Sequence, residues 1–253
     1  MTTTAITHHL RAGELELDGV LPWSSNYAFL GRVCADGVEL PVVYKPRRGE
    51  RPLWDFTQGT LCLREQAAFL VSQALGWRIV PPTVLRQGQH GLGSVQLFIE
   101  HDPERHYLTF EGDPILRTQL QRIVLFDVVI NNADRKSGHV LLEAEAETEA
   151  ETAVDALPSR LWGIDHGICF HSDPKLRTVI WEFAGTAVPL QHLADLEALR
   201  RRLDDKEDAL VLQLQDLLDG REHAALRQRL QKLIAQATFP NPGPGRHYPW
   251  PPV

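Results

Sequence analysis

The chain has few of the residues and patterns that mark several large protein classes. Its 253 residues include three cysteines, Cys34, Cys62 and Cys169, without paired spacing, so we expect a reducing compartment and no disulfide scaffold. No stretch reaches the roughly 18 consecutive apolar residues that a membrane-spanning helix needs. The opening residues, Met-Thr-Thr-Thr-Ala, lack the basic and apolar regions of an export signal. We therefore predict a cytoplasmic protein without integral membrane association.

Positive charge is also scarce. The chain has 26 Lys and Arg against 33 Asp and Glu, a net charge of −7. Proteins that bind nucleic acid over much of their surface are usually basic, so we expect no nucleic-acid partner. One local basic cluster remains within seven residues, and it is either a solvated loop or an anion site: Lys45, Arg47, Arg48 and Arg51.

The first hundred residues have the pattern of a β-sheet with one main helix. Residues 14–20 alternate charged and apolar side chains, as a half-buried strand does. Apolar residues recur with a period close to 3.6 over residues 61–75, which predicts a helix capped by Thr60 and ended by Gly76. The remaining strands are expected at residues 27–34, 38–45, 78–85 and 94–100. Because the first 45 residues otherwise suggest strands and turns, no helix is expected there.

Residues 101–253 have a mainly helical pattern. Asp113 followed by Pro114 is typical of a helix start, and this helix should run to about Ile130. Two short apolar runs, 140–142 and 161–164, are expected to pair as a hairpin. The Glu/Ala-rich segment between them, 143–156, is interpreted as a solvated insertion. Further helices are expected at residues 190–203, 206–218 and 222–235.

The last segment, residues 239–253, holds six of the 17 prolines together with Tyr248 and Trp250. It is either an extended strap that packs its aromatic side chains on the body of the protein or a proline-rich ligand for a partner. An indole favours burial, so the strap is the preferred interpretation, with Trp250 buried.

Four polar features occur in an order that suits phosphoryl transfer, which requires a triphosphate, a metal ion and an acceptor to be held together. Lys45 ends the third predicted strand, where a fixed ammonium group can bind phosphate oxygens. Glu65 follows 20 residues later, in the first turns of the predicted helix, and can pair with that lysine. Each residue alone would be interpreted as solvent-exposed.

The other two features lie in the second half. Asp134 and His139 stand five residues apart in a polar loop, 131–139, with the spacing of the Asp-x-x-x-x-Asn motif of kinases. Asp165-His166-Gly167 ends the hairpin, and a carboxylate there can hold magnesium. Asp134 and Asp165 are 31 residues apart, and the Glu/Ala-rich insertion accounts for the length beyond a hairpin-sized connection.

Together these motifs resemble a bacterial family of short proteins related to the phosphatidylinositol 3-/4-kinases. The likeness covers nearly the whole chain and includes Tyr44-Lys45-Pro46, residues 49–56, Arg64-Glu65, the 131–139 loop and Asp165-His166-Gly167. The resemblance implies an α+β, two-lobed protein-kinase-like fold. A β-rich N-lobe with one main helix would cover residues 1–100, and a mainly helical C-lobe residues 101–253. It also implies ATP and Mg²⁺ as cofactors.

The resemblance assigns roles to single residues. Lys45 would contact the phosphates, with Glu65 as its partner, and Asp134 would orient the acceptor hydroxyl or take its proton. Asp165 would bind the metal, and His139 occupies the second ligand position. The other expected cofactor-binding residues are Ser24, Ser25 and Asn26 over the phosphates, and Gln96, Phe98 and Ile99 along the adenine pocket.

The chain departs from the kinase pattern in three respects. It has no Gly-x-Gly-x-x-Gly motif. His139 stands where related kinases carry an asparagine, and an imidazole is a poor magnesium ligand, which favours either Mn²⁺ or weakened catalysis. Lys175 and Arg177 are the only nearby positive charges after Asp165-His166-Gly167, so support for a phosphoinositide headgroup is thin.

Three functions remain open on the sequence. The first is an ATP-dependent phosphotransferase acting on a hydroxyl of a small polyol, an inositol-like molecule or a protein. The alternative is a catalytically weak or inactive nucleotide-binding module, a pseudokinase, which His139 favours. The third is a metal site unrelated to kinases, formed by His166, Cys169 and His171, for which no fourth ligand is evident.

Overall fold

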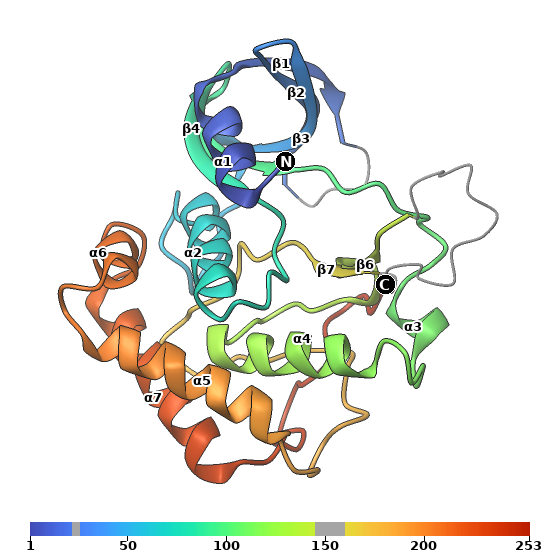
Figure 1. Ribbon diagram of the computed structural model, residues 1–253, viewed down its shortest axis with the longest axis vertical. Coiled ribbons are helices and arrows are strands. Elements are labelled where there is room, and N and C mark those ends of the chain that lie inside the picture. Colours follow the sequence, from blue (N-terminus) through green and yellow to red (C-terminus); the bar gives the residue numbers. More distant parts are fainter. Residues whose placement is uncertain (22–25, 145–159) are drawn as a thin grey trace.

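The computed structural model describes residues 1–21, 26–144 and 160–253. A curled antiparallel sheet forms one lobe, helices form most of the other, and a short hairpin lies between them (Figure 1). The two-lobed, α+β, kinase-like fold predicted from the sequence is therefore confirmed. From residue 145 onward, the predicted Glu/Ala-rich insertion lies outside the described residues.

The N-lobe sheet has the strand order β1-β2-β3-β5-β4, with antiparallel neighbours. In strand β3, Val42 and Tyr44 are buried in the core of this lobe. Because successive side chains of a strand point to opposite faces, Lys45 points away from that core. The strands are β1 (Glu14–Val20), β2 (Phe29–Ala35), β3 (Val38–Pro46), β4 (Thr83–Gly88) and β5 (Gly91–Leu97).

The last two strands of the sheet differ from the expected ranges. They were predicted at 78–85 and 94–100, but β4 begins only after Pro81 and Pro82, which have no N–H group for a ladder. The turn between β4 and β5 consists of Gln89 and His90 and is closed by Gly91, whose φ of +93° is readily adopted only by glycine.

Two helices accompany the sheet. Helix α1 (Thr3–Ala12) contradicts the expectation that the first 45 residues contain no helix, and Thr2 Oγ1 caps it by accepting a hydrogen bond from Ala5 N. Helix α2 (Leu61–Ala74) confirms the predicted main helix, and Gly76 follows it with a φ of +70°. Thr60 stands at the N-cap without a capping bond. Glu50 instead accepts the hydrogen bond of Cys62 N.

The C-lobe is built around helix α4 (Arg117–Ile130), most of which is buried in the core. It begins later than predicted because Asp113 accepts a hydrogen bond from Ile115 N and forms a turn instead. No helix in the described ranges is both long and apolar enough to cross a membrane. The remaining elements are α3 (Tyr107–Phe110), β6 (Val140–Leu142), β7 (Leu161–Gly163), α5 (Leu190–Asp204), α6 (Ala209–Gln215), α7 (Gly220–Gln236) and two 3₁₀ turns, η1 (Arg47–Gly49) and η2 (Ser137–His139).

Helix α2 shares its hydrophobic core with the C-lobe. Ala67, Phe69 and Val71 belong to the same buried cluster as α4 and α7. A buried ion pair, Arg64 Nη2 to Glu222 Oε1 at 2.5 Å, joins α2 to α7 as well. The helix that carries Glu65 is thus fixed against the C-lobe. The domain boundary near residue 100 stays a prediction.

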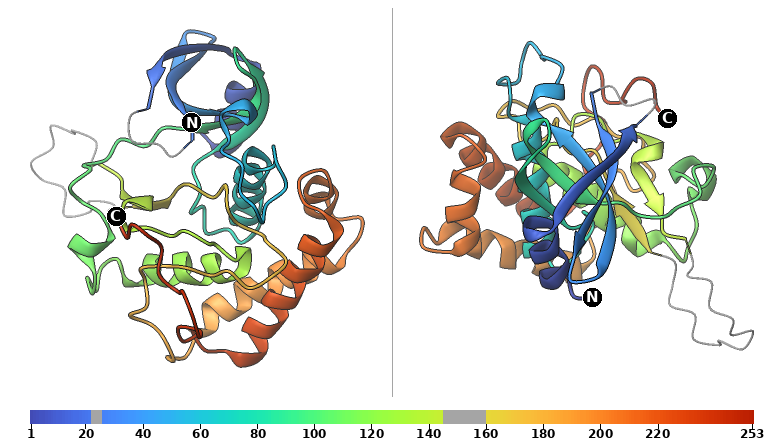
Figure 2. Two further views of the ribbon diagram at one scale, coloured as in Figure 1. Left: turned by 180° about the vertical axis from the view of Figure 1, so that it is seen from behind. Right: turned by 90° about the horizontal axis from the view of Figure 1, so that it is seen from above.

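The proline-rich segment after α7 runs along the C-lobe and ends near the β6–β7 hairpin (Figure 2, left). Phe239 is buried against Phe183, with ring centroids 5.5 Å apart, as expected of a strap. The expectation that Trp250 is buried is wrong, because 77% of this residue is exposed. The strap is also held through its backbone, since Phe239, His247 and Pro252 each offer a carbonyl oxygen to an N–H of the C-lobe, which the sequence pattern does not reveal.

Candidate active site

Three charged side chains from distant parts of the chain meet at one point. Lys45 Nζ, at the end of β3, lies 2.5 Å from Glu65 Oε1 on α2 and 2.9 Å from Asp165 Oδ1 just after β7. The second oxygen of Glu65 accepts a hydrogen bond from His166 N at 3.1 Å. The structure therefore brings together Lys45, Glu65 and Asp165, which the sequence motifs had singled out separately.

The charges of this triad stabilise one another. Burial acts to lower the pKa of Lys45, but the carboxylates of Asp165 and Glu65 outweigh it and raise the pKa. The charge of Lys45 in turn holds the pKa of Asp165 well below its usual range. Asp165 adopts a left-handed backbone with a φ of +61°, which is unusual for a non-glycine residue and frequent at functional sites. Its side chain is 43% exposed, so the ionised carboxylate can still bind a ligand.

His139 faces the free oxygen of Asp165. Its Nδ1 donates a hydrogen bond to the backbone oxygen of Asp134 at 2.9 Å, and the 3.5 Å contact with Lys136 N is too long to compete. Burial lowers the pKa of His139 to about 4, so the ring is neutral at pH 7 and Nε2 carries a lone pair. That nitrogen lies 3.4 Å from Asp165 Oδ2. Two electron-rich atoms facing each other without a proton suit a cation.

Asp134 lies on the same loop, half-buried. Burial raises the pKa of its carboxyl group to about 6, while Lys136, with Nζ 3.7 Å from Oδ2, acts to lower it. Asn132 Oδ1 accepts a hydrogen bond from Asp134 N at 3.0 Å and fixes the backbone there. Asp134 therefore combines a fixed backbone with a carboxylate suited to accepting a proton near neutral pH.

A second ion pair, Arg135 with Asp127, holds this loop from behind, and sequence reasoning missed it. Arg135 Nε and Nη2 each donate to Asp127 at 2.9 Å, and both side chains are fully buried. Arg135 Nη1 donates to the backbone oxygens of His139 and Ile164 at 3.0 Å. The only signal in the sequence was one acidic residue within the apolar run 123–130 of α4.

His166 belongs to this supporting layer. Its Nε2 accepts a hydrogen bond from Arg135 Nη2 at 2.8 Å, and its ring packs edge-on against Phe126 at 5.6 Å. Burial lowers the pKa of His166 well below its usual value, so the ring is neutral. His166 is thus a core residue that ties Arg135 to the segment carrying Asp165.

The other predicted cofactor-binding residues are more scattered. Ser24 and Ser25 lie outside the described residues, and Asn26 Oδ1 accepts a hydrogen bond from Arg51 N at 2.8 Å. Gln96 is buried within the sheet, where its amide donates to Thr83 Oγ1. Ile99 packs with Leu141 and Trp162 in a small apolar cluster at the hairpin, and Phe98 lies half-buried with its ring 6.0 Å from that of His101.

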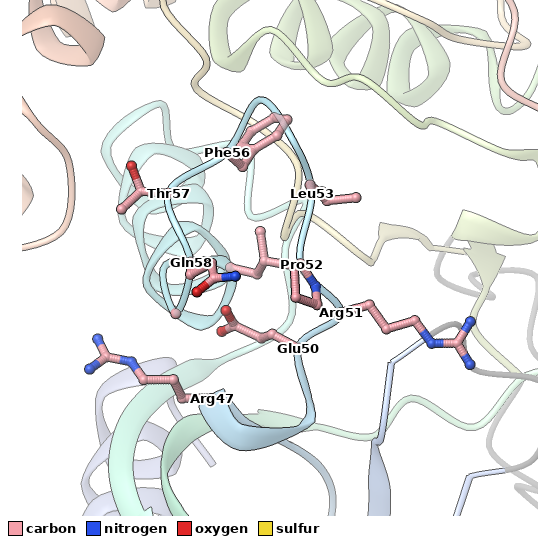
Figure 3. A pocket seen from close by; sticks show the side chains of 10 residues that line it. Arg47, Glu50, Arg51, Pro52, Leu53, Phe56, Thr57 and Gln58 are labelled. Carbon is pink, nitrogen blue, oxygen red and sulfur yellow. The ribbon is translucent and has the colours of Figure 1, made fainter.

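A cavity of about 300 Å³ lies under the loop between β3 and α2 (Figure 3), and none of the three triad residues lines it. Glu50 turns into this loop and caps α2, whereas Arg47 and Arg51 extend in opposite directions (Figure 3). The basic residues 45–51 therefore do not form a single anion site, because Lys45 is paired with carboxylates and the arginines diverge.

The unrelated metal site considered for His166, Cys169 and His171 is not supported. His171 Nε2 donates to the backbone oxygen of Asp55 at 2.9 Å, and Cys169 is fully buried. Within residues 1–21, 26–144 and 160–253, no group of three or more His, Cys, Asp or Glu side chains could hold a metal ion. A cation at Asp165 and His139 would thus need ligands from water or a bound substrate.

Comparisons with known proteins show which proteins the chain is similar to. No family model matches it. It is 28% identical to phosphatidylinositol 4-kinase gamma 4 of Oryza sativa subsp. japonica over 126 residues, which cover 44% of this chain but only 20% of the plant protein. Two solved kinases resemble it weakly, each at 12% identity. The Helicobacter pylori proinflammatory kinase CtkA has a TM-score of 0.46, with 91% of this chain and 94% of that chain covered. The Rio2 kinase of Chaetomium thermophilum has a TM-score of 0.41, with 92% and 74% covered.

One bacterial relative aligns with this chain over almost the full length of both proteins. Protein Rv2133c of Mycobacterium tuberculosis is 37% identical over 279 aligned residues, which cover 96% of this chain and 93% of that protein. The chain therefore belongs to the family of Rv2133c.

Proposed function

We propose that the protein is an ATP-dependent phosphotransferase of the phosphatidylinositol 3-/4-kinase-like type. Its acceptor would be a hydroxyl group of a small polyol, an inositol-like molecule or a protein. One observation carries the proposal: Lys45 lies between buried Glu65 and half-exposed Asp165, with Asp134 on the adjoining loop. Phosphoryl transfer depends mainly on positioning and charge, which this arrangement supplies.

Lys45, Asp165 and His139 would hold the nucleotide and its metal. Lys45 would place its ammonium group on phosphate oxygens, while Glu65 keeps the side chain extended. Asp165 Oδ2 and His139 Nε2 would be the protein ligands of a divalent ion, which neutralises phosphate charge when bound. Two protein ligands fit an ion that keeps several waters and phosphate oxygens. A nitrogen ligand favours Mn²⁺ over Mg²⁺.

Asp134 would act on the acceptor. With its pKa near 6, its carboxylate is mostly ionised at pH 7 and can accept the proton of an attacking hydroxyl group. The positive charge of Lys136 keeps the pKa of Asp134 from rising further. The same charge would favour an anionic transferred group.

The remaining predictions are retained as parts of this proposal. Ile99, together with Leu141 and Trp162, offers an apolar surface for adenine, next to Phe98 and Gln96. Asn26, with Ser24 and Ser25, would cover the phosphates. The cytoplasmic location and the absence of a nucleic-acid partner stay predictions.

The proposal is tested by following radiolabelled γ-phosphate from ATP with Mg²⁺ or Mn²⁺. Inositol-type polyols and the protein itself would be offered as acceptors, and ADP formation would be measured in parallel. Asp134→Asn should lower the transfer rate about 100-fold or more, with nucleotide affinity unchanged, because it removes the base. Wild-type rates in Asp134→Asn would contradict the role of Asp134.

The alternative is a nucleotide-binding module without transfer activity. It is favoured by His139, which replaces the asparagine of active kinases. Stabilisation of the protein by ATP in the presence of either metal, without any ADP formation in the same samples, would decide for this alternative.

A further inference from the structure

The segment after α7, residues 238–253, is here called the C-terminal strap. It leaves the helix at Ala237, where the backbone turns left-handed, and its first residue, Thr238, pairs with Ala187. From there it runs along the C-lobe towards the β6–β7 hairpin (Figure 2, left). The strap therefore ends close to the elements that carry Asp134 and Asp165.

Two backbone hydrogen bonds join the strap to the site. Thr178 N donates to His247 O at 3.1 Å, and Ser137 N donates to Pro252 O at 2.8 Å. Thr178 lies in the segment that follows Asp165, and it also bridges to Arg135 in the 131–139 loop. Both segments that carry the proposed catalytic and metal-binding groups are thus bonded to the strap.

Ser137 is the point at which the outer side of the 131–139 loop is held. Its Oγ accepts a hydrogen bond from Leu108 N at 3.0 Å and contacts His106 Nδ1 at 2.8 Å. With the strap in place Ser137 is fully buried, and Pro252 O supplies the acceptor that this buried N–H requires, since an unpaired buried donor is unfavourable. Arg135 holds the inner side of the same loop. The loop is therefore clamped from two sides.

The composition of the strap suits this task. Pro249, Pro251 and Pro252 have fixed φ angles and no N–H groups, so the end of the strap is stiff, and these three residues offer carbonyl oxygens without backbone donors. Ordering such a segment costs less conformational entropy than ordering a flexible one. Phe239 anchors the beginning of the strap, whereas Tyr248 and Trp250 near its end contribute little to anchoring because both are exposed.

We propose that the strap is a positioning element of the active site: the Pro252 carbonyl, through Ser137, holds Asp134 in register with Asp165. The proposal rests on the proposed function. It assigns to the proline-rich segment a role in catalysis and not in nucleotide affinity, because the hydrogen bonds of Lys45 run to Glu65 and Asp165 and those of the strap run to other residues.

A matched pair of substitutions isolates the Ser137–Pro252 bond. Ser137→Ala keeps the N–H and loses the hydroxyl group, whereas Ser137→Pro loses both. Proline fits the backbone here, because Ser137 is the first residue of η2 and Lys136 before it is extended, with φ −84° and ψ 165°. Deletion of residues 249–253 removes the acceptor and leaves Ser137 intact, so the test does not depend on one variant folding.

ATP hydrolysis with water as the acceptor gives kcat and KM for each variant. Ser137→Pro and the deletion should each lower kcat about tenfold, as expected for misplaced catalytic groups, with KM for ATP within about twofold of wild type. Ser137→Ala should keep most of the activity. Adding Ser137→Pro to the deletion should cause no further loss, because both remove one bond. Hydrogen exchange of the 134–139 amides should become faster in both variants.

Wild-type kcat in the deletion variant, or equal kcat in Ser137→Pro and Ser137→Ala, would overturn the role of the strap and leave the proposed function standing. A wild-type protein that binds nucleotide under neither metal would contradict the proposed function itself, and the positioning role falls with it.

Discussion

The two ion-pair systems of the site differ in how much they leave exposed. Arg135 and Asp127 are completely buried, and each of the five N–H groups of the guanidinium has an acceptor within the protein. Lys45 and Asp165 keep 24% and 43% of their side chains exposed. The first pair has no capacity left for a ligand, whereas the second has. Exposure, more than charge, separates the supporting pair from the proposed binding site.

The largest effect should come from breaking the buried ion pair of Arg135 and Asp127, called the sealed pair below. Arg135→Met leaves Asp127 buried and unpaired, so the free energy of unfolding should fall by about 3 to 5 kcal/mol in chemical denaturation. The double variant Asp127→Leu/Arg135→Met should lose less than the sum of the single variants, because no charge stays uncompensated. If Arg135→Met lowered the free energy of unfolding by less than about 1 kcal/mol, the claim that the sealed pair is structural would be contradicted.

The triad of Lys45, Glu65 and Asp165 is called the open triad below. Breaking it should weaken ATP binding more than it destabilises the fold. Lys45→Met should weaken ATP binding at least about tenfold, equal to about 1.4 kcal/mol, in calorimetric titration. The loss of apo stability should stay well below that of Arg135→Met, because Asp165 is partly solvated. Lys175→Met breaks an ion pair with Asp55 outside the triad and serves as the control that should keep ATP affinity. A large loss of apo stability with unchanged affinity would mark Lys45 as structural.

Substitution of Asp134, unlike the two substitutions above, should increase the stability of the apo protein. Its pKa is raised from 3.8 to about 6 in the folded protein, so the folded state binds more protons and loses stability as pH rises between these values. Asp134→Asn removes this penalty and should stabilise the apo protein by about 1 to 2 kcal/mol at pH 7.5, with little effect at pH 4. Thermal unfolding at both pH values measures the difference, and destabilisation at pH 7.5 would refute it.

The smallest effect concerns the choice of metal. If His139 Nε2 is a ligand, ATP should bind more tightly with Mn²⁺ than with Mg²⁺, and His139→Asn should reduce that preference about threefold or more. The ratio of ATP dissociation constants in the two metals gives the result. An unchanged ratio would remove His139 from the metal site.

The sequence predicted the open triad better than the sealed pair. Strand alternation and helical periodicity located β3 and α2, so Lys45 and Glu65 could be paired before the structure was considered. The Asp-x-Gly motif located Asp165 in the same way. These residues were recognised by their chemistry and their spacing, although Glu65 is buried and Lys45 and Asp165 are not.

The sealed pair could not be predicted because its importance depends on burial. Arg135 looks like a solvated loop residue until the structure places it against Asp127, and the supporting role of His166 appears only in the hydrogen bond that it accepts from Arg135. Backbone contacts were equally hidden, so Trp250 was wrongly expected to anchor the strap. Tertiary hydrogen bonds of this kind leave no periodic signal in the chain.

Thermal unfolding with ATP and Mg²⁺ or Mn²⁺, on wild type and Asp165→Asn, tests the central claim most directly. ATP at about 100 times its dissociation constant should stabilise the wild-type protein by about 2.7 kcal/mol, and the metal-dependent part should vanish in Asp165→Asn. The absence of stabilisation with either metal, or equal stabilisation of Asp165→Asn, would contradict the claim that the half-exposed triad binds a nucleotide and its metal.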